Sequence, residues 1–163
     1  MFENLVNLVK EHAGDAIVNN PAIPNEHNDA AISDTATGIM DALKSQIASG
    51  NGANVAGLLS SSGNISSNPM VTNIVQSVAG GLMSKFGLDA TAANSIVASM
   101  VPNVLNSLTK KTNDPNDKSF DLQGILSAVG GGNLDIASII GQVAGGGNAT
   151  GGIAGMLKGL FGK

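Results

Sequence analysis

The sequence lacks several residue types on which common protein chemistries depend. Its 163 residues include no cysteine, no tryptophan, no tyrosine and no arginine, and phenylalanine occurs only four times. The absence of cysteine excludes a disulfide framework, a thiolate metal site and a cysteine nucleophile. The formal net charge is −4, and the chain has no arginine and few aromatic rings that could stack on bases. Such a chain is poorly suited to bind nucleic acid. We therefore expect no nucleic-acid partner.

Charged residues are also scarce, whereas glycine and the neutral polar residue asparagine are abundant. Charged residues make up 12% of the chain, about half the share usual in globular proteins. Glycine occurs 22 times and asparagine 18 times. Few charges leave little repulsion between copies, and apolar stripes without charged borders favour association. The composition therefore favours a homo-oligomer or a filament, with the chain itself as partner.

Neither a secretory signal nor a membrane span is expected. Glu3, Lys10 and Glu11 interrupt the apolar residues near the N-terminus, and no basic start or small-residue cleavage site is present. The uncharged and largely apolar stretch at residues 136–157 contains three consecutive glycines at 145–147, which is unfavourable for a spanning helix. We expect a cytoplasmic location, with signal-independent export left open.

The pattern of apolar residues predicts an all-α fold. Apolar positions recur at three- and four-residue steps over 2–17, 32–47, 71–86 and 92–108, which indicates amphipathic helices. No segment alternates apolar and polar residues as a strand would. The predicted architecture is a helical bundle of about four longer helices, followed by short glycine-rich helices.

Helix starts, stops and breaks are also marked in the sequence. Asn68 before Pro69, and Asp89, are favourable N-caps, and Gly87 is a favourable stop. The pair Gly80–Gly81 inside a helix predicts a bend or a close backbone contact, because glycine there costs about 1 kcal/mol relative to alanine. Pro102 predicts a kink or the start of a new helix.

The chain divides into three parts by composition: a helical bundle domain at 1–111, a polar loop at 112–120 and a glycine-rich tail of short helical repeats at 121–163. The repeat unit is a polar or small residue, an aliphatic, any residue, a small residue and two large aliphatics. Such short helices are unstable alone, so each must bury its apolar stripe within the chain or on another copy. The copies are 121–126, 135–140 and 152–157, with an earlier one at 54–59.

Residues 71–108 carry a resemblance to a known family. The quoted features are Gly80–Gly81–Leu82, the turn Phe86–Gly87–Leu88, and a helix from Ala93 in which an aliphatic run is broken by Pro102. With these features the chain resembles the YidB-like family of small bacterial proteins, a domain of unknown function, over about residues 1–126. The loop 113–117 followed by Phe120 and Asp121 looks like the variant of Bacteroidetes members. The resemblance implies an all-α fold and a bacterial origin, and no catalytic residue; the long glycine-rich tail departs from shorter members.

No catalytic, metal or cofactor site is predicted. The only histidines, His12 and His27, match no zinc-ligand spacing, and we expect both to lie on the solvated surface. The loop starting at Asp114 fails the calcium pattern, since a lysine and a serine stand at its fifth and sixth positions; Asp121 is expected to cap a helix instead. With no nucleophile elbow and no phosphate loop, we expect neither an enzyme nor a cofactor.

The end of the tail carries the predicted self-association site. Gly151, Gly155 and Gly159 are four residues apart, so a helix would place them on one face and allow a second backbone to approach closely. The remaining predicted contact residues are apolar: Ile153, Met156, Leu157, Leu160 and Phe161.

We therefore predict a structural, self-assembling protein in which the tail packs against other copies. The alternative is a membrane-associating module that uses the same apolar tail and its two lysines.

Overall fold

The computed structural model describes residues 1–61, 63, 65–131, 138, 139 and 141, and over these residues the fold is all-α, without strands. The α-helices of this part are α1 (Phe2–His12), α2 (Asn28–Gln46), α3 (Gly52–Ser60), α4 (Pro69–Phe86), α5 (Ala90–Thr112) and α6 (Leu122–Gly130). A π-helical turn over Gly14–Val18 and a 3₁₀ turn over Asn25–His27 connect α1 to α2, and a second π-helical turn, Ile47–Asn51, connects α2 to α3. None of the described helices is both long enough and apolar enough to cross a membrane.

The predicted helix ends are confirmed by their hydrogen bonds. The side chain of Asn68 accepts from Met70 N at 2.9 Å, and that of Asp89 accepts from Ala92 N at 2.9 Å. Each bond satisfies a backbone donor that has no partner inside the helix. Gly87 ends α4 with φ of 64°, a left-handed conformation that glycine adopts without steric cost.

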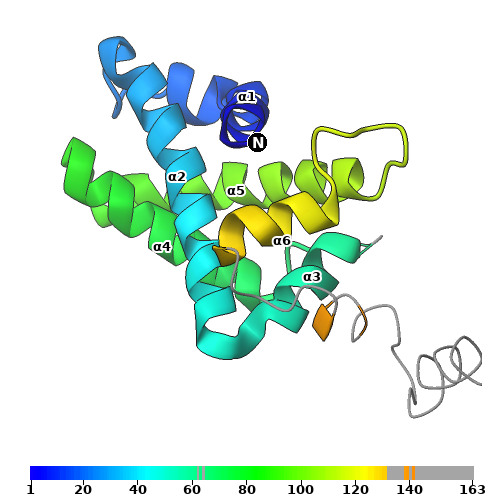
Figure 1. Ribbon diagram of the computed structural model, residues 1–163. Helices are drawn as coiled ribbons and strands as arrows, with labels where there is room; N and C mark the ends of the chain where they lie inside the picture. The colour runs from blue at the N-terminus through cyan, green and yellow to red at the C-terminus, as the bar shows by residue number, and fades with distance from the viewer. Residues whose placement is uncertain (62, 64, 132–137, 140, 142–163) are drawn as a thin grey trace, which may run out of the picture.

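The core lies where the long helices meet. α4 packs against both α2 and α5, and α1 packs against α2 and α5 (Figure 1). The buried side chains are almost all aliphatic, so the core depends on apolar burial and not on polar networks. The largest fully buried side chains are Leu8, Ile17, Ile23, Ile39, Leu43, Leu58, Leu59, Ile74, Leu82, Ile96, Met100 and Leu105.

The first unit of the glycine-rich tail belongs to this core. α6 packs against α2 and α3 (Figure 1, yellow to orange), and its N-cap Asp121 accepts from Gly124 N at 2.6 Å, as predicted. Ile125, Leu126 and Val129 are buried there, as is Phe120 just before the helix. Of the two ways in which this unit could bury its apolar stripe, within the chain or on another copy, the structure shows packing within its own chain.

The residue Ile139, from the next unit, also lies against the body of the chain. It is partly buried against the core, and a Cβ placed on Gly52 would lie 3.0 Å from its Cδ1 atom. The beginning of α3 is therefore covered by an aliphatic side chain from a position almost 90 residues later.

Two local expectations need correction. α5 continues through Pro102 as one helix, so the proline does not start a new helix there, although proline inside a helix costs about 3 kcal/mol. The residues around it explain why, since Val101, Val104 and Leu105 are completely buried and a break would expose them. The second correction concerns Gly80 and Gly81 of α4: no described atom lies within 4 Å of a Cβ placed on either one, so the predicted close contact is not made within this part of the chain.

Candidate functional site

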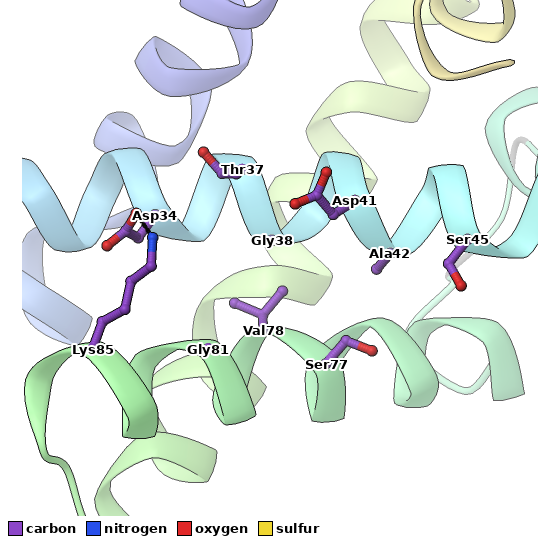
Figure 2. Close-up of a pocket in the computed structure, with 10 residues that line it drawn as sticks. All are labelled: Asp34, Thr37, Gly38, Asp41, Ala42, Ser45, Ser77, Val78, Gly81 and Lys85. Carbon is purple, nitrogen blue, oxygen red and sulfur yellow. Dashed lines mark hydrogen bonds and ion pairs between the residues drawn. The ribbon is translucent and has the colours of Figure 1, made fainter. Parts of the chain in front are cut away.

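The close backbone contact in this fold is at Gly38 of α2. A Cβ at Gly38 would lie 3.2 Å from Val78 Cγ2 and 3.5 Å from Val78 Cα. α2 and α4 therefore approach closely at this point, and Figure 2 shows Gly38 directly opposite Val78. A side chain at position 38 would require Val78 to shift by a few tenths of an ångström or more.

A shallow groove runs along the line where α2 and α4 meet. Its volume is about 330 Å³, and its walls are mostly small side chains from the two helices (Figure 2). Lys85 Nζ contacts Asp34 Oδ1 at 2.5 Å at one end. Asp41, further along the groove, forms no ion pair within the described residues. The remaining lining residues are Thr37, Gly38, Ala42, Ser45, Ser77, Val78 and Gly81.

The outer face of α4 continues from this groove and carries no charge until Lys85. No acidic or basic residue occurs between Lys44 and Lys85, or between Asp89 and Lys110. The outward positions of α4 are instead small or neutral: Thr72, Asn73, Gln76, Ser77, Gly80, Gly81 and Ser84 are all exposed. We call these seven residues the α4 face. The small side chains of the α4 face allow another helix to approach closely, and no charged side chain of this face would have to lose its hydration.

The histidines do not form a metal site. His12 is half-buried, and its Nε2 lies 2.9 Å from Ser107 Oγ, so it joins α1 to α5 and does not lie free on the surface as expected. His27 is exposed, as predicted, with its ring centroid 6.2 Å from that of Phe86. Within the described ranges, no three His, Asp or Glu residues are grouped so as to hold a metal ion.

The acidic loop before α6 is organised by its own hydrogen bonds. Asp117 Oδ1 accepts from Ser119 N at 2.9 Å, and Lys111 Nζ lies 3.2 Å from Asp117 Oδ2. The backbone bond from Ser119, followed by the Lys111 bond, lowers the pKa of Asp117 below its ordinary value. Asp114 Oδ1 accepts from Asn116 N at 2.9 Å. This loop is a sequence of local turns that ends at the cap of α6.

The residues predicted to mediate self-association lie outside the described residues. These are Gly151, Ile153, Gly155, Met156, Leu157, Gly159, Leu160 and Phe161. The structure instead draws attention to the α4 face, which was not singled out as a site. The uncharged run from 45 to 84 was the signal in the sequence that could have identified it.

Comparison of the chain with protein families, with curated proteins and with solved structures finds no match.

Proposed function

We propose that this chain is a structural protein that assembles with copies of itself into a homo-oligomer or a filament. The observation that supports the proposal best is the α4 face. Its two central glycines, Gly80 and Gly81, cost the helix about 1 kcal/mol each relative to alanine, and no contact in the described part of the chain requires them. A second copy approaching this face would use the space that they leave open.

The same face imposes little electrostatic cost on association. Burying a charged side chain between two copies requires its desolvation, and the α4 face has no charged member. Its serine, threonine and amide side chains supply hydrogen bonds at the rim of a contact. If the surface that receives this face is a different one, the contact does not close on itself, and copies add end to end as a filament.

The other sequence-based predictions form part of this proposal. They are membership of the YidB-like family, a cytoplasmic location, the absence of enzymatic activity, and a body of four longer helices followed by short glycine-rich helices. The terminal segment with Gly151, Gly155 and Gly159 would then add a second contact between copies. Co-sedimentation with anionic vesicles tests the membrane alternative, and binding that requires residues 151–163 would support it.

The test of the proposal compares Gly80→Ala/Gly81→Ala with Gly57→Ala. Gly57, in α3, also has no described atom within 4 Å of its Cβ position, and it lies off the α4 face. Both variants are expected to stabilise the monomer, by about 1 kcal/mol for each glycine replaced. Only the double variant should weaken assembly, because its methyl groups keep the second copy at a distance.

A charge placed on the face provides an independent test. Ser77→Lys puts an exposed cation in the middle of the α4 face, whereas Asn7→Lys puts one on the exposed side of α1. Sedimentation velocity and negative-stain electron microscopy of the full chain are the assays. We expect Ser77→Lys to shift the population to monomers and Asn7→Lys to assemble as the unmodified chain does. Equal assembly of the two variants would contradict the proposed contact surface.

A further inference from the structure

A second pocket lies where the chain leaves α3 and passes the last turns of α5. It is separate from the groove between α2 and α4. Its volume is about 250 Å³, slightly below the lower end of the range for drug-sized ligands, about 300 Å³. The described side chains that line it are Ser61, Asn106, Thr109, Lys110 and Asn113. Polar and cationic groups therefore surround a space suited to a small molecule.

Thr109 provides the observation that points to a ligand. The residue is 3% exposed, and its hydroxyl oxygen is buried without any hydrogen-bond partner. Three other helical threonines donate to the carbonyl four residues earlier: Thr35 to Ala31, Thr37 to Ser33 and Thr112 to Leu108. Buried hydroxyls are normally paired, so an unpaired one at the wall of a pocket leaves a donor for a bound group.

Lys110 supplies an unused positive charge at the same place. Its neighbour Lys111 pairs with Asp117 at 3.2 Å, whereas Lys110 forms no ion pair within the part of the chain that the structure describes. The Asn106 side chain also forms no hydrogen bond with the described residues and has two amide hydrogens to donate. Three unused donor groups, one of them cationic, therefore lie on one face of α5.

The remaining two polar residues fix the shape of the pocket. Asn113 Nδ2 donates to Leu59 O at 3.1 Å and to Thr109 O at 2.8 Å, so the amide joins the end of α3 to α5. Ser61 Oγ donates to Gly57 O at 2.8 Å. Both side chains use their hydrogens internally, and only their oxygens face a ligand as acceptors.

We propose that this pocket binds a small oxyanion, a carboxylate or a phosphate, through Lys110, Thr109 and Asn106. Hydrogen bonds to ionised groups are the stronger class, and a ligand oxygen at the Thr109 hydroxyl would satisfy a group that the free chain leaves unpaired. A hydroxyl on the ligand would pair with the acceptor oxygens of Ser61 or Asn113. This inference does not depend on self-assembly.

The test is a titration of the isotope-labelled full chain by amide NMR. The probes are inorganic phosphate and glycolate, with sodium chloride at matched ionic strength as the control. We expect saturable shifts at Asn106, Thr109 and Lys110 with one or both probes and none with chloride; phosphate alone identifies a phosphate site and glycolate alone a carboxylate site. No saturable shift with either probe, or equal shifts with chloride, would overturn the proposal.

Variants separate binding from folding. Lys110→Gln should weaken binding by about tenfold or more, whereas Lys118→Gln, an exposed lysine of the loop before α6, should leave the affinity unchanged. Thr109→Val removes the hydroxyl at nearly constant shape, so it should raise Tm without ligand and reduce the affinity severalfold. A Tm that falls without ligand would show that the hydroxyl has a partner inside the protein, and this would refute the argument.

Discussion

Leu126→Ala tests directly whether the first tail unit belongs to the core. Leu126 of α6 is 0% exposed, and α6 packs against α2 and α3. Truncating a buried leucine costs about 2–5 kcal/mol, since the transfer free energy is lost and a cavity remains. This is a large part of the 5–15 kcal/mol that stabilises a typical domain.

The assay is urea denaturation followed by far-UV circular dichroism, because the chain has no tryptophan or tyrosine to report by fluorescence. Ser127→Ala is the matched control: it is the adjacent residue of α6 and is exposed, so its free energy of unfolding should change by less than about 0.5 kcal/mol. The loss at Leu126 should be independent of protein concentration, since the contact is within one chain.

Two results would refute this reasoning. A change below about 0.5 kcal/mol for Leu126→Ala, the range of ordinary surface substitutions, would mean that α6 is not seated on the core. A loss that shrinks on dilution would mean that α6 packs on another copy, because both chains would then lack that contact at low concentration.

Three further predictions concern the helix contacts, the caps and the acidic loop. Gly38→Val should lower the free energy of unfolding by about 1–3 kcal/mol, because its side chain would press against Val78 where α2 and α4 pack closely. Thermal denaturation checks this, and an unchanged Tm would contradict the close packing. Asp89→Ala should cost about 1 kcal/mol through loss of the bond to Ala92 N, measured by urea titration, and Asp89→Asn should keep most of that stability. The pKa of Asp117 is lowered in the folded chain, so its stabilising contribution is complete above the ordinary pKa of a free aspartate, about 4. It is lost as the pH falls through the lowered value. Asp117→Asn should therefore flatten the acid limb of the stability–pH profile, and an identical limb in the variant would refute the assignment.

The features that could be predicted from the sequence are local ones. Helix periodicity and the caps at Asn68, Asp89 and Asp121 depend on residues within one turn of each other, and the structure confirms them. The all-α class follows from the same periodicity. These signals do not require knowledge of which helices meet.

The features that sequence reasoning missed depend on contacts between distant segments. A lone glycine at position 38 looks like a weak helix residue until Val78 is placed against it. The pair Gly80–Gly81 is more conspicuous in the sequence, although none of the described residues contacts it. Pro102 was expected to kink α5 or to start a new helix, and the second of these is wrong, because burial of the aliphatic residues around it keeps the helix continuous. The unpaired hydroxyl of Thr109 and the cis packing of α6 likewise exist only in three dimensions.

Sedimentation velocity of the full chain over a wide range of concentration tests the central claim most directly, with Ser77→Lys measured alongside. If the chain assembles through the α4 face, the sedimentation coefficient of the unmodified chain rises with concentration, and Ser77→Lys stays near the value of a 16.2 kDa monomer. If both chains sediment as monomers at every concentration, the proposed structural role is wrong.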